Sequence, residues 1–176
     1  MPDAPGLELI RGAIEAAHPG AVLDTGFAQQ RAVLSIEPSR VLDVLGWLRD
    51  APGQGYKFLS SLHAADYLPA SPRFAVHYEL LNRDRVERIR VKALLDDPAA
   101  VAADEALPEI DSCVELFPTA EFQEREVFDF FGIVFKGHPD LTRILLPDDY
   151  VGWPQRRDFP VGGEPVTFTY NEQSYG

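Results

Sequence analysis

A dense series of prolines divides this chain into two unlike parts. Five prolines and three glycines are spread over residues 138–165, namely Pro139, Pro147, Pro154, Pro160 and Pro165 with Gly152, Gly162 and Gly163. Proline fixes its own φ angle and lacks an amide hydrogen, so helices and strands are discouraged throughout this stretch. Upstream of Gly137 the apolar residues recur with regular spacing. The sequence therefore predicts a compact domain over residues 1–137 and an extended arm over residues 138–176.

The first part shows the alternating signals of an α+β domain. Apolar spacing predicts helices around residues 7–17, 39–50 and 119–131, strands at 21–27 and 31–36, a strand followed by a loop within 56–67, and strands at 73–81 and 88–93. The order is α-β-β-α-β-β-β-α. A helical stripe and a sheet face must each bury their apolar sides. We therefore expect two layers, with the helices packed on one face of a mixed β-sheet.

The last two of these strands alternate strictly. Phe74, Val76 and Tyr78 take every second position of one strand, and the turn 82–84 follows. The second strand then places Val91 on one face and Arg90 on the other, with Arg88 and Lys92 beside it. Successive strand residues point to opposite faces. The pattern predicts a hairpin with one buried face and one wet face.

The charge balance excludes some partners. The net charge is -12, whereas nucleic acids and anionic membranes attract basic patches. Residues 1–135 contain 12 Lys and Arg against 22 Asp and Glu, while residues 136–176 contain 4 against 6. The arm is thus nearly neutral and better suited to lie against another protein.

No apolar run approaches the roughly 18 residues that a membrane-spanning helix needs, so no direct membrane span is expected. The acidic, proline-rich start has the character of neither a secretory nor an organelle targeting signal, which leaves a cytoplasmic location. Cys113 is the single cysteine. An internal disulfide is therefore impossible, and this chain alone cannot build a cysteine-ligated iron-sulfur or zinc site. A buried, unreactive thiol is expected.

The helix at residues 119–131 has two distinct faces. Thr119 can cap its start, and Gly132 can end it in the left-handed conformation. Glu121, Arg125 and Asp129 are four residues apart and are expected to form a row of surface ion pairs.

Glu126 stands between Phe122 and Phe130 at the same four-residue spacing. We therefore expect its carboxylate to be partly buried and to require a cationic or hydrogen-bonding partner.

The run from Glu124 to Pro160 reads EREVFDFFGIVFKGHPDLTRILLPDDYVGWPQRRDFP. It resembles the signature of one family of peripheral subunits, the one designated C in respiratory NADH-quinone oxidoreductase. The matching positions are residues 124–126, 131–133, 137–141, 143–145, 147–149, Gly152, Pro154 and 156–160. Thr142 stands where the family usually has a basic residue, and Gln155 stands where leucine is common. The order and spacing of the signature are nevertheless kept.

The resemblance implies a soluble, non-catalytic subunit on the cytoplasmic side of the membrane. It would be docked chiefly on the neighbouring subunit designated D, which helps to form the quinone site, and would support assembly. In that complex the flavin and the iron-sulfur clusters are held by other subunits. No cofactor is therefore expected in this chain, in agreement with its single cysteine. The alternative is the equivalent subunit of a related membrane-bound hydrogenase or dehydrogenase complex.

The arm carries more apolar and aromatic residues than a disordered tail normally has. It is expected to lie in a groove of a partner, and the other possibility is that it folds back over its own sheet. Aromatic residues and arginine are the anchors that protein interfaces favour. The candidate interface residues are Arg125, Glu126, His138, Arg143, Tyr150, Trp153, Arg156, Arg157 and Phe159.

Other groups could suggest chemistry. Arg143, Arg156 and Arg157 could bind a phosphate or lipid headgroup, but pairing with carboxylates of a partner suits the guanidinium fork better, and no phosphate-binding glycine loop accompanies them. His138, before Pro139, could be a metal ligand or proton carrier, although a locally hydrogen-bonded turn residue is the more usual role.

A free-standing small enzyme is a different class, and the sequence offers little for it. His63, Asp66 and Tyr67 imitate part of a catalytic cluster, yet the nearby Ser60 and Ser61 lack a glycine-bounded elbow. The adjacent pairs Asp96-Asp97 and Asp148-Asp149 suit turns or caps better than acid-base catalysis.

Overall fold

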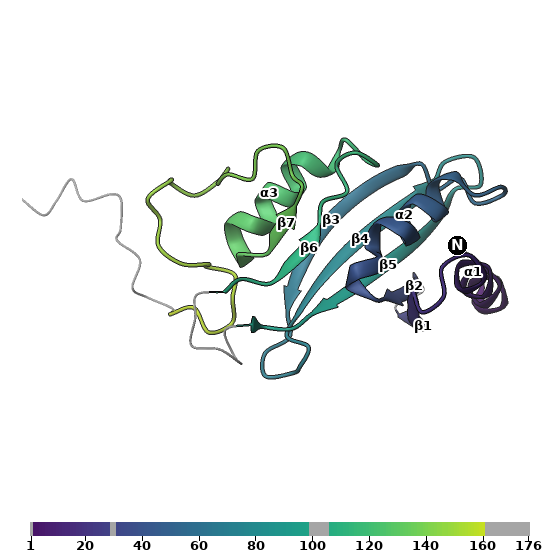
Figure 1. Ribbon diagram of the computed structural model, residues 1–176, viewed down its shortest axis with the longest axis horizontal. Coiled ribbons are helices and arrows are strands. Elements are labelled where there is room, and N and C mark those ends of the chain that lie inside the picture. Colours follow the sequence, from purple (N-terminus) through teal and green to yellow (C-terminus); the bar gives the residue numbers. More distant parts are fainter. Residues whose placement is uncertain (1, 29–30, 99–105, 161–176) are drawn as a thin grey trace, which may run out of the picture.

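The computed structural model describes residues 2–28, 31–98 and 106–160. Within these ranges five strands form one sheet in the order β1-β2-β5-β4-β3 (Figure 1). The strands are β1 (Val22–Ala28), β2 (Arg31–Ile36), β3 (Phe58–Asp66), β4 (Phe74–Asn82) and β5 (Glu87–Leu95). The β2–β5 pair is parallel and the other neighbours are antiparallel. The sheet is mixed, as the sequence predicts.

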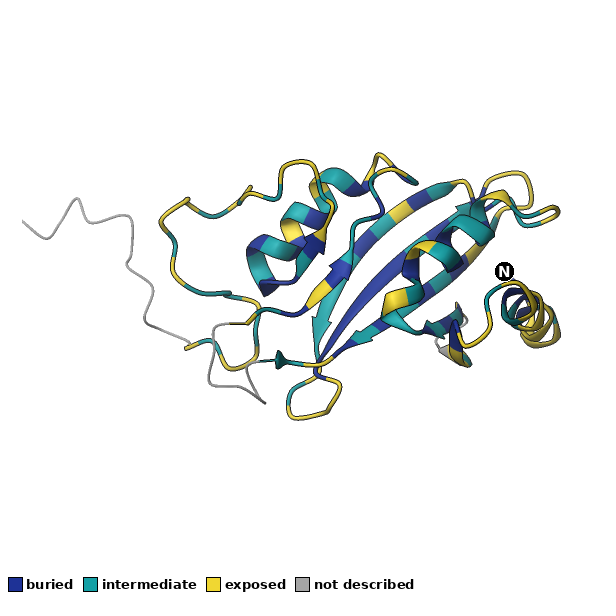
Figure 2. Cartoon of the chain, in the orientation of Figure 1, coloured by how far each residue is buried: buried dark blue, intermediate teal, exposed yellow. Residues whose placement is uncertain are grey.

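The helices pack on one face of this sheet. They are α1 (Ala4–Ala17), the short 3-10 helix η1 (Pro38–Arg40), α2 (Val41–Asp50) and α3 (Ala120–Phe131). Leu7, Val44 and Val127 from the α-helices join the strand residues of one continuous core. Figure 2 shows the buried residues as dark-blue segments on both the strands and the helices. The predicted two-layer α+β fold is confirmed.

Two short strands were not predicted. β6 (Glu109–Asp111) and β7 (Val134–Lys136) pair in parallel as a second, two-stranded sheet beside α3. Three residues are too few to show the alternation that reveals a strand. In the segment 56–67, where a strand followed by a loop was expected, β3 instead continues to Asp66.

The expectation of a fully wet hairpin face was wrong at one end. Ala75 and His77 point away from the helices, yet they are only 0% and 5% exposed. The ring of His63 stacks on His77 with centroids 5.1 Å apart, and the hydroxyl of Tyr67 lies 3.3 Å from His77 Nε2. Aromatic side chains on β3 and just after it therefore help to cover this part of β4.

No helix in the described ranges is long and apolar enough to cross a membrane. Cys113 is buried, and burial raises the pKa of its thiol. The expectation that this thiol is buried is confirmed.

Candidate functional site: the anchored arm

The described part of the arm, residues 138–160, lies against α3 and the nearby end of the sheet (Figure 1). It contains turns but no helix or strand. Its course is fixed by three groups of hydrogen bonds to the domain, centred on Asp129, Phe131 and Arg73. The remainder of the predicted arm, residues 161–176, lies outside the described residues.

Asp129 is the first anchor, and its side chain is fully buried. One carboxylate oxygen accepts hydrogen bonds from the backbone amides of Ile144, Leu145 and Leu146 at 3.1, 2.7 and 2.9 Å. The other oxygen accepts one from Arg143 Nη1 at 2.7 Å. Burial opposes ionisation, but these donors outweigh it and lower the pKa of Asp129 below its ordinary value.

Arg143 closes the arm upon itself. Its Nη2 donates to the carbonyl oxygens of Tyr150 and Gly152 at 3.0 and 3.1 Å, while Nη1 also donates to the backbone oxygen of Asp129 at 3.0 Å. The guanidinium lies over the Trp153 ring, 4.7 Å from its centroid. The planar fork of arginine can serve all these acceptors together, which a lysine ammonium cannot.

Trp153 provides the contact between the arm and the end of α3. Gly132 ends the helix at φ +68°, and a Cβ placed there would lie 2.5 Å from the Trp153 ring. This glycine is therefore required twice, for its backbone conformation and for the close approach of the indole. The predicted left-handed end of the helix is confirmed, whereas no pattern in the sequence indicates the indole contact.

The second anchor follows at Phe131. Arg156 Nε donates to the Phe131 carbonyl at 2.7 Å, and the amide of Gln155 donates to the carbonyl of Phe130 at 3.1 Å. These bonds occupy carbonyl groups at the end of α3 that have no partner within the helix. The Arg156 guanidinium lies 4.9 Å from the Phe74 ring centroid. Burial lowers the pKa of Arg156.

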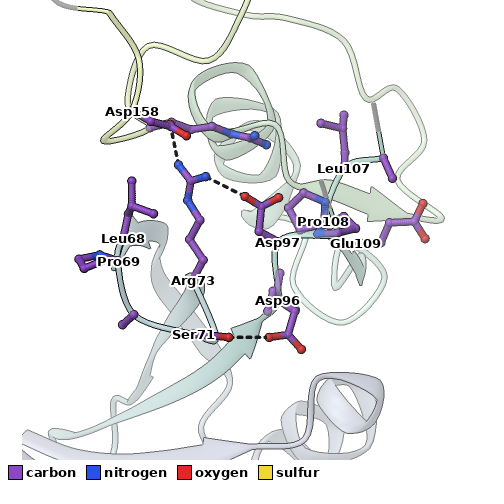
Figure 3. Close-up of a pocket in the computed structure, with 15 residues that line it drawn as sticks. Leu68, Pro69, Ser71, Arg73, Asp96, Asp97, Leu107, Pro108, Glu109 and Asp158 are labelled. Atoms are coloured by element: carbon purple, nitrogen blue, oxygen red, sulfur yellow. Dashed lines mark hydrogen bonds and ion pairs between the residues drawn. The ribbon is translucent and has the colours of Figure 1, made fainter. Parts of the chain in front are cut away.

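The third anchor is Arg73, whose guanidinium pairs with carboxylates of three segments. It pairs with Asp66 at 2.8 Å, Asp97 at 2.7 Å and Asp158 of the arm at 2.6 Å. Figure 3 shows the pairs with Asp97 and Asp158. The amide of Arg157 also donates to Asp66 at 2.8 Å. Burial opposes ionisation of Asp66, but the bonds from Arg73 and from backbone amides lower its pKa to about 2.

The remaining candidate interface residues lie at different points along α3 and the arm. Arg125 donates to the backbone oxygens of Thr142 and Arg143. His138 accepts from the amide of Asp140 and lies 3.0 Å from the Glu121 carbonyl oxygen, so its predicted local turn role is confirmed. Tyr150 and Phe159 stack with centroids 6.3 Å apart. Arg157 is exposed.

Two expectations for α3 were wrong. Asp129 does not join a surface row with Glu121 and Arg125, because the arm covers it and Arg143 pairs with it. Glu126 is exposed, and the buried carboxyl is Glu124 instead. Glu124 precedes the buried Val127 by three residues, so helical spacing could have revealed its position on the apolar face.

Glu124 fastens the loop after β6 to α3. Its carboxyl group is 0% exposed and accepts hydrogen bonds from Ser112 Oγ at 2.6 Å and from the amide of Cys113 at 2.8 Å. Burial raises the pKa of Glu124, and the hydrogen bonds only partly offset this effect. Thr119, expected to cap the helix with its side chain, instead donates its hydroxyl to the carbonyl of Leu59 on β3.

The groups that imitate a catalytic cluster do not come together as a triad. Ser61 Oγ lies 3.3 Å from His63 Nδ1, but Asp66 is occupied by Arg73. His63 therefore lacks Asp66 as an orienting partner. Within the described ranges, no group of three or more His, Cys, Asp or Glu residues could hold a metal ion.

The fold and the arm together define the class of protein. It is a two-layer α+β domain whose proline-rich C-terminal segment is fixed to the domain by buried arginine-carboxylate pairs. The model of the family described as respiratory-chain NADH dehydrogenase, 30 Kd subunit, matches residues 34–165. The subunit designated C in the NADH-quinone oxidoreductase of Roseiflexus castenholzii is 43% identical over 159 residues, covering 90% of this chain and 87% of that protein. The chain belongs to this family.

A further relative agrees with this membership, and a solved structure shares the fold. The corresponding NADH-quinone oxidoreductase subunit of Herpetosiphon aurantiacus is 45% identical over 139 residues, which cover 79% of this chain and 77% of that protein. A chain in the structure of the membrane-bound sulfane sulfur reductase, described as an archaeal respiratory membrane complex, has the same fold. Its TM-score is 0.67 at 23% identity, with coverage of 88% of this chain and 85% of that one.

Proposed function

We propose that this chain is a non-catalytic subunit of the proton-translocating NADH-quinone oxidoreductase, and that its arm docks on the subunit that forms the quinone site. Family membership supports the assignment to the complex. The proposed role is to support assembly. The flavin and the iron-sulfur clusters that carry electrons from NADH to quinone belong, in this proposal, to other subunits, and the chain is held on the cytoplasmic side of the membrane through its neighbours.

The observation that carries the docking proposal is the outward side of the arm. Leu145 and Val151 are 62% and 88% exposed, although the backbone amide of Leu145 is bound to the buried Asp129. Arg157 is likewise exposed while its amide is bound to Asp66. A fixed backbone thus presents apolar and cationic side chains outward. Such a surface loses little conformational entropy when a partner binds it.

The test replaces the outward residues and spares the anchors. A tagged chain with Leu145→Glu and Val151→Glu is expressed in the native host, and the partners recovered from gently solubilised membranes are quantified together with NADH-dependent quinone reduction. We expect both to fall together, because a charge buried in an apolar interface is costly. Leu9→Glu is the matched control, since Leu9 of α1 is 76% exposed.

Normal recovery of partners by the double variant would refute docking through the arm. Recovery of the unaltered chain with hydrogenase subunits would instead transfer the proposal to a related complex, and recovery of the chain alone would refute the subunit role. An Arg157 substitution that left the abundance of the complex normal but abolished electron transfer would contradict a purely assembling role.

A further inference from the structure

The sheet has a second face that lies opposite the helices. Core residues such as Leu34, Tyr78 and Val91 point toward the helices and are 0% exposed. The residues between them in sequence point the other way, because successive strand residues alternate. No helix of residues 2–28, 31–98 and 106–160 packs on this second face, since the buried apolar residues of α1, α2 and α3 all belong to the core on the first.

The second face is basic, although the chain as a whole is acidic. Arg31 of β2 and Arg88, Arg90 and Lys92 of β5 lie on it, which is four of the chain's 16 Lys and Arg residues. Only two of the 28 Asp and Glu residues lie there in the strands, namely Asp24, opposite Ser35, and Glu79, opposite Arg90. The strand residues of this face therefore carry a net charge of +2, and the remainder of the molecule carries -14.

Half of these cations have no carboxylate partner within the described chain. Arg90 forms a close ion pair with Glu79, and Arg31 lies 3.6 Å from the same carboxylate oxygen. Arg88 is exposed and has no ion pair with a described residue. Lys92 likewise has no described carboxylate partner and lies 5.6 Å from the centroid of the Tyr67 ring. Among the described residues, these two positive charges on β5 are therefore unpaired and can accept an external partner.

Apolar and aromatic surface accompanies the charges. Val33, Leu81 and Leu94 share this face and are partly exposed. The rings of His63 and His77 lie beside them, and burial together with the neighbouring cations lowers the pKa of His77 to about 3. His77 itself is buried, so the half-buried ring of His63 that stacks on it supplies the aromatic surface here. Arginine and aromatic residues around an apolar centre are typical of protein interfaces.

We infer that this basic sheet face binds an acidic surface of a neighbouring protein, as a second interface that is separate from the arm. A partly apolar face with one lysine and three arginines suits a protein, because arginine forms fixed pairs with carboxylates. The acidic remainder of the molecule would repel an anionic bilayer or a nucleic acid. The inference goes beyond the proposed function, which requires only the arm.

The test uses charge reversal within the assembled complex. A tagged chain with Arg88→Glu and Lys92→Glu is compared with the unaltered chain and with a control carrying Arg11→Glu and Lys136→Glu. The control positions belong to surface ion pairs on α1 and β7. Solubilised complexes are washed with rising KCl, and the protein retained per tagged chain is measured. Because facing like charges oppose association, we expect roughly tenfold less retention for the sheet variant at moderate salt.

A photo-crosslinking amino acid at position 88, with one at position 11 for comparison, identifies what lies on the face. The inference predicts a covalent product at position 88 with a segment of another protein that carries Asp or Glu beside the attachment point. A product with lipid, a product with a neutral or basic segment, or no product would overturn it. Retention equal to that of the control would also overturn it, provided that the unaltered chain recovers its neighbours. The urea midpoints of both variants show that each remains folded.

Discussion

Asp129 and Arg143 form an ion pair of 2.7 Å in which the carboxylate is fully buried and the guanidinium is 12% exposed. The carboxylate belongs to α3 and the guanidinium belongs to the arm. The same carboxylate also binds the amides of three successive arm residues. This pair thus determines where the arm leaves the domain and how it turns.

Replacing Arg143 tests how far this pair stabilises the fold. Arg143→Ala would leave a buried, negatively charged Asp129, and we expect a loss of about 3–5 kcal/mol in the free energy of unfolding. Arg143→Lys should lose less, because it keeps a positive charge but cannot reach both Tyr150 and Gly152. Urea denaturation of the purified chain measures both. A lysine variant as stable as the unaltered chain would show that the fork geometry is unimportant, whereas equal losses for Ala and Lys would show that a positive charge alone does not replace the fork.

Gly132→Ala tests the contact between the arm and the helix end. The left-handed φ angle and the clash with Trp153 together should cost about 2–5 kcal/mol. Adding Trp153→Ala removes the clash and leaves the backbone strain. The double variant should therefore lose less stability than the sum of the two single variants. Thermal unfolding of the four proteins measures this coupling, and simple additivity would contradict the contact.

Glu124→Gln should change how stability depends on pH. The folded-state pKa of Glu124 is raised from its ordinary 4.5. Its contribution is therefore fully present below pH 4.5 and is lost as the pH rises through the folded-state pKa. The glutamine variant has no such loss. We expect its urea midpoint to improve relative to the unaltered chain from pH 4 to pH 7, and a constant difference would refute a raised pKa.

Asp66→Asn should have the opposite pH signature. The pKa of Asp66 is lowered from 3.8 to about 2, so its contribution is present above pH 3.8 and is lost as the pH falls through about 2. The variant should be the less stable protein at pH 5, and the difference should shrink toward pH 2. Denaturation in urea at pH 5, 4, 3 and 2 measures the difference, and a gap that widened in acid would contradict the pairing with Arg73.

The sequence predicts the sheet well and the arm's contacts poorly. Strict alternation in β4 and β5 reveals both strands and the basic face that includes Arg90, because this pattern is local. The pairing of Asp129 with Arg143 joins a helix to an irregular segment 14 residues later, and no periodic pattern records it. Glu124 is an intermediate case, since its spacing to Val127 places it on the apolar stripe although its partners, Ser112 and Cys113, lie in a loop.

The three anchors of the arm all come earlier in the sequence than the arm itself. Asp129, Phe131 and Arg73 all precede the arm residues that bind them. During synthesis, each docking position on the domain has therefore left the ribosome before the arm segment that occupies it. The arm can therefore dock last, after the domain has folded. A partner protein that binds the arm in place of the domain would break no strand pairing when the arm is released.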